Sequence, residues 1–252
     1  MRITGLQLDI AWEAKVQNQT RIEGIIGSAG ADDLLVLPEM FSTGFTMNSA
    51  AAAEQEGGAT EQWLSSLARK LGCAVMGGNV RESTDGRCFN ESLTYTSDGM
   101  LACRYQKIHP FSLGEEDKHY AAGTEVKSFA LGNAVIAPFI CYDLRFPEAF
   151  RLASKSGANL IAVIANWPSK RIQHWVTLLQ ARAIENLAYV IGVNRTGKDP
   201  HLEYTGRSVI VDYMGEIIAD AGSDEGLISA DLNFEELNRW RDSFPALRDR
   251  KL

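Results

Sequence analysis

Residues 137–150 read APFICYDLRFPEAF. The stretch begins as an apolar run typical of a buried strand and changes at Cys141 to a charged segment, in which Pro147 fits the start of a helix. A cysteine that only fills space could lie anywhere in the run, whereas one at the strand's end can face a cleft. Because α/β folds are built from strands that pass directly into helices, the stretch predicts such a fold with Cys141 at a strand end.

The rest of the chain repeats this alternation of short apolar runs and longer amphipathic ones. Buried strands are predicted within residues 33–40, 73–80, 134–143, 159–167 and 189–197, and helices over 17–27, 60–71, 147–156 and 171–187. Residues 1–12 alternate like a further strand. Residues 206–220 form two extended runs across a turn at Met214 and Gly215, which adds antiparallel pairing. The pattern indicates an α/β domain.

Composition favours one large domain over several small ones. The chain has 252 residues, of which 45% are hydrophobic and 23% charged, and it contains no repeat or long linker. We therefore predict a single domain over residues 1–252. Its charged tail, from about residue 233, carries apolar residues that include Trp240 and Phe244. We expect that tail to pack against the domain or a second subunit.

Charge and cysteine usage narrow the class of partner. The formal net charge is −7 and no dense Lys/Arg cluster stands out, which argues against nucleic-acid binding. No apolar run approaches the roughly 18 residues of a spanning helix, and the N-terminus does not resemble a signal peptide. The four cysteines are scattered, which favours free thiols in a reducing cytoplasm over a metal site. A small molecule is the expected partner, with no nucleic acid, membrane, metal or cofactor.

Three polar residues follow predicted strands. Glu39 comes after the run LLVL and a proline, and Lys107 and Cys141 each follow a strand of their own. Ligand clefts in open α/β sheets form at the carboxyl ends of strands, so the three side chains are expected to converge. Glu39 could then take the thiol proton, while Lys107 stabilises a thiolate and the oxyanion formed when the thiol attacks a carbonyl.

Each of these residues also has an ordinary explanation. A lone cysteine is most often a packing residue, and a lone Glu or Lys in a loop is most often a solvated charge. His109 suggests a Cys–His pair instead, although a histidine beside Pro110 is equally well explained by structure. The positions alone leave these alternatives open.

Several motifs together resemble the nitrilase, or carbon–nitrogen hydrolase, superfamily. They surround the acid (LPEMFSTGF), the lysine (YQKIHPF) and the cysteine (ICYDLRFPE), and are followed in order by ANWP, QARAIENLAYVIGVNRTG and YTGRSVIVDYMGEII. The likeness runs from about residue 3 to residue 232. It implies an α-β-β-α sandwich with two mixed sheets and a catalytic triad of Glu39, Lys107 and Cys141.

The resemblance also implies a second catalytic glutamate after the lysine. Counting back from Gly123, where members of the superfamily have a Pro-Gly or similar turn, selects Glu116. Ala122 stands here in place of the usual proline, so the adjacent Glu115 remains an alternative. Family members usually pair through the surface near the cysteine-bearing element and the C-terminal segment, which implies at least a homodimer.

Within the superfamily the chain is similar to the ω-amidase-like, YafV-type branch. That likeness implies hydrolysis of the terminal amide of a short 2-oxo dicarboxylic acid monoamide, such as 2-oxoglutaramate, with release of ammonia. Nitrile hydrolysis, N-carbamoyl amino acid hydrolysis and a non-catalytic binding role remain alternatives. Arg145 is a candidate for binding a substrate carboxylate, or it holds its loop through Asp143 or Glu148. The candidate substrate-binding residues are Tyr142, Arg145, Phe45, Phe111, Asn166 and Trp167.

Overall fold

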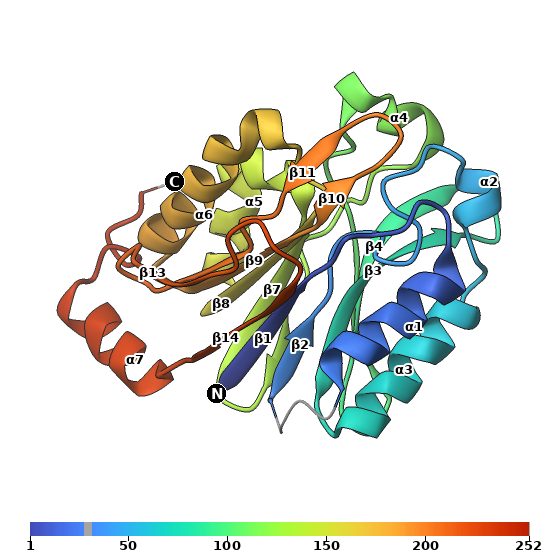
Figure 1. The fold of residues 1–252 in the computed structure, drawn as a ribbon. Helices are drawn as coiled ribbons and strands as arrows, with labels where there is room; N and C mark the ends of the chain where they lie inside the picture. Colours follow the sequence, from blue (N-terminus) through green and yellow to red (C-terminus); the bar gives the residue numbers. More distant parts are fainter. Residues whose placement is uncertain (28–31, 252) are drawn as a thin grey trace.

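Two six-stranded mixed sheets lie face to face in the computed structural model of the chain, which describes residues 1–27 and 32–251 (Figure 1). The last residue of the predicted tail, Leu252, lies outside the described residues. The first sheet has the order β14 (Gly226–Asp231), β1 (Arg2–Gln7), β2 (Leu34–Val36), β3 (Ala74–Glu82), β4 (Cys88–Tyr95) and β5 (Leu101–Gln106). The second has the order β13 (Ile217–Asp220), β12 (Val209–Val211), β9 (Tyr189–Asn194), β8 (Leu160–Ala165), β7 (Ala134–Ile140) and β6 (Phe129–Leu131).

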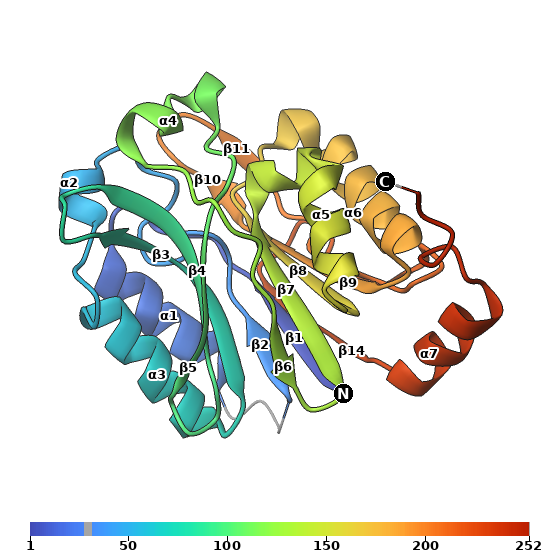
Figure 2. The same ribbon diagram turned by 180° about the vertical axis from the view of Figure 1, so that it is seen from behind.

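Each sheet has a parallel centre with antiparallel strands at its edges. Strands β1, β2 and β3 pair in parallel, as do β7, β8 and β9. Parallel neighbours need crossover helices, here α1 (Lys15–Ile26) and α3 (Ala59–Leu71) for the first sheet and α5 (Pro147–Lys155) and α6 (Ile172–Asn186) for the second. Each pair covers the outer face of its sheet, as Figures 1 and 2 show. This is the predicted α-β-β-α sandwich.

The apolar runs are continuous because the central strands are buried on both faces. On β2, Leu34 and Val36 point into the core between the sheets, whereas Leu35 points into the core beneath α1 and α3. Successive side chains of a strand point to opposite faces, so both kinds of position must be apolar in a four-layer sandwich. The predicted strands and the four long helices are therefore all present, with ends shifted by a few residues.

Short elements gather at one end of the sandwich. They comprise α2 (Ser49–Ala52), α4 (Glu116–His119), the 3₁₀ turns η1 (Ser112–Gly114), η2 (Cys141–Arg145) and η3 (Ser169–Arg171), and the hairpin of β10 (Thr196–Lys198) and β11 (Glu203–Thr205). Figure 1 shows α4 and the hairpin at this end and the N-terminus at the other. No helix within the described residues is long and apolar enough to cross a membrane.

The tail forms a helix, α7 (Phe234–Ser243), that packs on the domain at both ends, since Arg241 near its end donates to Leu187 O at 2.7 Å and to Ala158 O at 2.9 Å. Phe234 and Leu237 are buried, and Trp240 is partly buried. Phe244, just beyond the helix, stacks on Trp240 but keeps 48% of its surface exposed. The domain thus covers Phe234 and Leu237, and the expected burial of Phe244 against the domain or a second subunit stays a prediction.

Candidate active site

Cys141 lies on a sharp turn between strand β7 and helix α5. Its backbone has φ 45°, in the left-handed region that residues with a Cβ rarely adopt. Asp143 supports the turn, because its Oδ2 accepts hydrogen bonds from Ile140 N at 3.0 Å and from the Tyr105 hydroxyl at 2.8 Å. Such strain is often kept where it orients a functional side chain, and here it turns Cys141 out of the strand.

Glu39 is fully buried at a similar turn after β2. The next residue, Met40, also has a positive φ of 44°. Glu39 Oε1 accepts hydrogen bonds from Lys107 Nζ at 3.0 Å and from Asn90 Nδ2 at 2.7 Å, and Oε2 accepts one from Asn166 N at 2.7 Å. Both carboxylate oxygens are therefore held in place, as a buried carboxylate requires.

Lys107 lies between two carboxylates. Its Nζ donates to Glu39 Oε1 at 3.0 Å and to Glu116 Oε2 at 2.8 Å, and its side chain is 1% exposed. Burial alone would lower the pKa of Lys107, but the Glu116 and Glu39 carboxylates outweigh it and hold that pKa well above the ordinary value. The lysine is therefore a fixed cation.

The structure places Glu116, and not Glu115, beside Lys107. Glu116 is fully buried, and its Oε2 also accepts a hydrogen bond from Phe111 N at 2.6 Å. Burial raises the pKa of Glu116, an effect that Lys107 partly offsets. Glu115 points outward and forms an exposed ion pair with Lys118. Of the two alternatives, only Glu116 belongs to the buried cluster.

Asn90, which the sequence motifs did not single out, joins the two carboxylates. Its Nδ2 donates to Glu39 Oε1 at 2.7 Å and to Glu116 Oε1 at 2.9 Å. The residue is buried in the middle of β4, one strand away from the loop of Glu39. It fixes the distance between the two acids, so that Lys107 can contact both.

The thiol of Cys141 is neutral at rest. Burial, reinforced by the Glu39 carboxylate and only partly offset by Lys107, raises its pKa well above the ordinary value. Its Sγ lies 4.0 Å from the carbonyl oxygen of Asn166. The structure thus gives no support for a resting thiolate, and a thiol here needs a base that removes its proton during attack.

The Cys141 side chain opens onto a pocket of about 390 Å³. All six candidate substrate-binding residues line it. The complete lining is Phe45, Phe111, Cys141, Tyr142, Arg145, Asn166, Trp167, Pro168, Arg171 and Leu202. The pocket is thus lined by aromatic rings, two arginines and the thiol.

Arg145 is free to bind a ligand. Its guanidinium stacks on the Trp167 ring at 4.8 Å and approaches His174 Nδ1 at 3.2 Å. It makes no ion pair with Asp143 or Glu148 in the structure, so the loop-holding alternative has no contact to support it. Asp143 instead binds His109, whose Nδ1 lies 2.8 Å from its Oδ1. This contact supports a structural role for His109, the explanation that its place beside Pro110 suggested, over a Cys–His pair.

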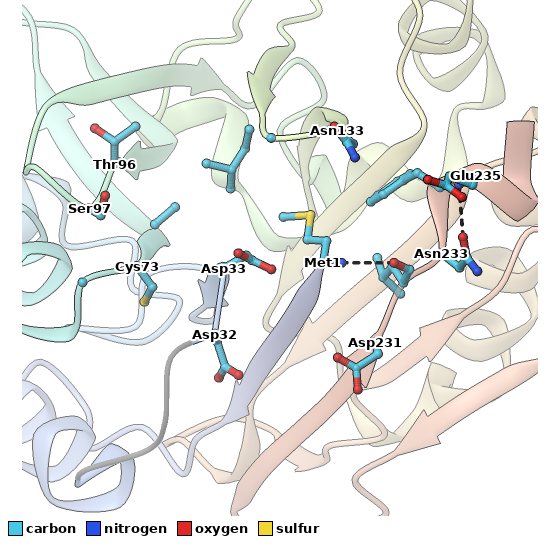
Figure 3. Close-up of a pocket in the computed structure, with 16 residues that line it drawn as sticks. Met1, Asp32, Asp33, Cys73, Thr96, Ser97, Asn133, Asp231, Asn233 and Glu235 are labelled. Carbon is cyan, nitrogen blue, oxygen red and sulfur yellow. Dashed lines mark hydrogen bonds between the residues drawn. The ribbon is translucent and has the colours of Figure 1, made fainter.

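A larger and more open pocket lies at the opposite end of the sandwich, beside Met1 (Figure 3). Its lining includes Asp32, Asp33, Asp231 and Cys73. Burial, together with the nearby Asp32, raises the pKa of the Cys73 thiol to about 11. No lysine or histidine lines this pocket within the described residues, so a thiolate of Cys73 would have no cation of that kind to stabilise it. The pocket around Cys141 is the better candidate site despite its smaller volume.

Comparison with known proteins identifies the family of the chain. The family model "Carbon-nitrogen hydrolase" matches residues 2–242. The chain is 40% identical over 253 residues to the ω-amidase YafV of Yersinia enterocolitica, covering 99% of this chain and 96% of the relative. It is 34% identical over 249 residues to the 2-oxoglutaramate amidase of Bacillus subtilis, covering 98% and 96%.

A solved structure shows the same fold. XC1258 from Xanthomonas campestris, described as a CN-hydrolase superfamily protein with an arsenic adduct in its active site, superposes with a TM-score of 0.94. The two chains are 35% identical, and the match covers 100% of this chain and 97% of XC1258. Family model, sequence relatives and fold agree over nearly the whole length, and this chain belongs to the carbon–nitrogen hydrolase family.

Proposed function

We propose that the chain is an amidase that hydrolyses the terminal amide of a short 2-oxo dicarboxylic acid monoamide, such as 2-oxoglutaramate, and releases ammonia. The observation that carries this proposal is the buried cluster of Glu39, Lys107 and Glu116 beneath a pocket that presents the Cys141 thiol and the unpaired Arg145. The relatives named as ω-amidase and 2-oxoglutaramate amidase support the choice of substrate.

In the first half of the reaction Cys141 forms a thioester. Its sulfur attacks the amide carbon while Glu39 takes the thiol proton, and Lys107 together with backbone N–H groups stabilises the oxyanion. As the tetrahedral intermediate collapses, the carbon–nitrogen bond breaks and Glu39 passes the proton to the departing nitrogen. Ammonia leaves, and the acyl group remains on Cys141.

Water completes the reaction. Glu39 takes a proton from the water molecule as its oxygen attacks the thioester carbon, and Lys107 again stabilises the oxyanion. The carbon–sulfur bond then breaks, the sulfur recovers its proton from Glu39, and the carboxylic acid is released. Glu116 stays bound to Lys107 throughout and keeps its ammonium directed at the oxyanion position.

The pocket orients the substrate from its other end. Arg145 offers its guanidinium fork to the distal carboxylate, since it has no carboxylate partner of its own. Phe45, Phe111 and Trp167 enclose the short chain between the carboxylate and the amide. The 2-oxo group of the proposed substrate comes from the likeness to the ω-amidases.

Ammonia release from a panel of compounds tests the proposal. The panel holds 2-oxoglutaramate, 2-oxosuccinamate, glutamine, asparagine, aliphatic nitriles and N-carbamoyl amino acids. We expect the two oxo-amides to be hydrolysed most efficiently. Turnover of nitriles or carbamoyl compounds without oxo-amide activity would overturn the substrate and leave the thiol mechanism intact.

Substitutions test the roles of the cluster. Cys141→Ala should abolish turnover, and Glu39→Gln and Lys107→Ala should each lower kcat by at least ~100-fold, the scale of losing a general base or an oxyanion donor. Arg145→Ala should act mainly through KM, because it removes binding and not chemistry. An active Cys141→Ala variant would rule out the thioester.

A further inference from the structure

The pocket contains a second cation, Arg171, that no sequence motif pointed to. Arg171 and Arg145 are the only Arg, Lys, Asp or Glu residues in the lining of the pocket as the structure describes it. Neither guanidinium has a carboxylate within 4 Å among the described residues. A buried or half-buried arginine normally has an anionic partner, so two unpaired ones in one pocket indicate an anionic ligand.

The two arginines are held by adjoining aromatic rings. The Arg171 guanidinium stacks on Phe111 at 5.4 Å, and that of Arg145 stacks on Trp167 at 4.8 Å. Trp167 also fixes the backbone of Arg171, because its Nε1 donates to the Arg171 carbonyl oxygen at 2.8 Å. Each guanidinium therefore lies over a ring, and the N–H groups of Arg145 that do not contact His174 Nδ1, with those of Arg171, can donate to a ligand.

Guanidinium groups are donors only. Each carries five N–H groups and accepts no hydrogen bond, so a pair of them favours several oxygen acceptors close together. A 2-oxo acid presents this pattern, with two carboxylate oxygens and the adjacent oxo oxygen. An amino acid presents an ammonium group at the same carbon, which needs an acceptor and is repelled by both cations.

The acids of the site cannot receive that ammonium. Glu39 and Glu116 lie beneath the thiol at the amide end, and their oxygens already bind Lys107, Asn90 and backbone or side-chain N–H groups. Neither acid lines the pocket as the structure describes it, whereas both arginines do.

We propose that Arg171 acts with Arg145 to read position 2 of the substrate, binding a 2-oxo carboxylate and excluding a 2-ammonium carboxylate. This inference rests on the proposed function in placing the amide at Cys141. It assigns the specificity for oxo-amides over amino acid amides to a pair of arginines, and it makes Arg171 a specificity-determining residue.

Three four-carbon amides that differ only at position 2 test the proposal: 2-oxosuccinamate, succinamate and L-asparagine. Binding is measured by calorimetry in a Cys141→Ala background, where no turnover occurs, and kcat and KM are measured in the active enzyme. We expect binding to weaken from the oxo compound to succinamate, and asparagine to bind least. Arg171→Gln should weaken 2-oxosuccinamate binding about 10- to 100-fold, the range for a hydrogen bond to a charged group, with kcat little changed.

Two further variants separate charge from geometry. Arg171→Lys keeps the positive charge but loses the planar set of guanidinium N–H donors. The variant should therefore still repel the ammonium group of asparagine but bind 2-oxosuccinamate more weakly than the parent does. Lys170→Gln removes the same charge one residue away, from an exposed side chain outside the pocket, and should bind all three amides like the parent.

The outcomes distinguish this inference from the proposed function. Unchanged binding of all three amides in Arg171→Gln, or an equal loss for all three, would overturn the role of Arg171. Asparagine bound as tightly as 2-oxosuccinamate by the parent would overturn the reading of position 2. The expected binding pattern without hydrolysis of any oxo-amide by the active enzyme would overturn the proposed function and leave the arginine pair standing.

Discussion

The protonation states of individual residues decide how the site can work. Lys107 is held as a cation by two carboxylates, so it cannot accept the proton of the thiol. The raised pKa of Cys141 keeps the sulfur protonated until a base acts. The charged groups that act most strongly on that pKa are Glu39 and Lys107, which supports Glu39 as the base of the proposed mechanism.

Alkylation of the four cysteines tests this arrangement. Iodoacetamide is itself a small primary amide, and we expect it to label Cys141 faster than Cys73, Cys88 or Cys103. Burial raises the pKa of the Cys73 and Cys103 thiols to about 11, and the nearby Asp32 adds to this effect for Cys73. Peptide mapping after brief labelling measures the order. The same experiment on Glu39→Gln should show slower labelling of Cys141 alone, and equal labelling of all four thiols would contradict the mechanism.

The two adjacent glutamates provide a matched pair of substitutions. Glu116→Gln removes a charge that binds Lys107 and should lower kcat/KM about 10- to 100-fold, the scale of a charge-assisted hydrogen bond. Glu115→Gln removes an equal charge from an exposed ion pair and should change activity little. If Glu115→Gln lowers activity more than Glu116→Gln does, Glu115 is the second acid.

The raised pKa of Glu116 also predicts how activity depends on pH. Because the Glu116 carboxyl group takes up its proton above pH 4.5, the ordinary glutamate value, activity should already fall above that pH as the solution is made more acidic.

Sequence position was enough to suggest Glu39, Lys107 and Cys141, because each follows a strand and strand ends meet at one edge of a sheet. It could not suggest Asn90. An asparagine in the middle of a strand has no local signal, and its importance comes only from the two carboxylates that the fold brings to it. Arg171 escaped notice for the same reason, since an arginine at a helix start is usually a solvated charge.

At the scale of elements, strand β3 supports the turn that carries Glu39. Gly78 on β3 has no room for a side chain, because a Cβ there would lie 2.2 Å from Met40 N and 2.7 Å from Glu39 Cα. The strand and the turn therefore touch backbone to backbone. The position of Glu39, the proposed general base, therefore depends on this glycine.

Gly78→Ala should therefore damage activity more than stability. The added methyl group must displace the Glu39 backbone, and misplacing a catalytic group by about 1 Å can cost ~100-fold in rate. We expect kcat to fall by about that factor, with a destabilisation of about 1–3 kcal/mol from overpacking. Steady-state kinetics and denaturant unfolding measure the two effects. Gly24→Ala is the control: it lies on α1 with nothing within 4 Å of its Cβ, and should stabilise the helix by roughly 0.5–1 kcal/mol.

The elements that periodicity identified were the doubly buried strands and the long helices. Periodicity did not identify Glu116, which was found only by counting back from the turn at Gly123 that the family likeness supplied. The structure shows why a glycine is needed at that turn. Gly123 N donates to Lys107 O at 2.8 Å, and a Cβ at Gly123 would lie 2.3 Å from Gln106 O. The turn thus returns the chain against the segment that bears Lys107, which brings Glu116 back to the lysine. Such long-range closure leaves little trace in local sequence.

At the scale of the whole molecule, the site exists only because the two sheets pack together. The first sheet and its loops supply Glu39, Asn90 and Lys107, and the second supplies Cys141 and Asn166. The hydrogen bond from Asn166 N to Glu39 Oε2 joins residues 127 positions apart across this interface. Anything that shifts one sheet against the other therefore changes the distance between base and nucleophile.

The exposed end of the tail is relevant to the oligomeric state, because the family likeness predicts at least a homodimer. Phe244 is 48% exposed and stacks on Trp240, whose ring lies tilted beside that of Tyr213 with the centroids 6.4 Å apart. An apolar surface of this kind favours contact with another protein surface, so we expect a second copy of the chain to cover it in a homodimer.

Light scattering with size-exclusion chromatography tests the homodimer. Phe244→Glu should shift the chain from dimer to monomer, because it places a charge where the partner would bury an aromatic ring. Val16→Glu is a matched control: Val16 is 75% exposed on α1, which lies on the opposite side of the molecule from α7 (Figures 1 and 2), and its replacement should leave the dimer intact. If the parent chain is itself a well-folded monomer at micromolar concentration, the tail is no interface and the dimer is excluded. If both variants stay dimeric, the chain pairs through another surface, and the helix that bears Cys141 becomes the next one to substitute.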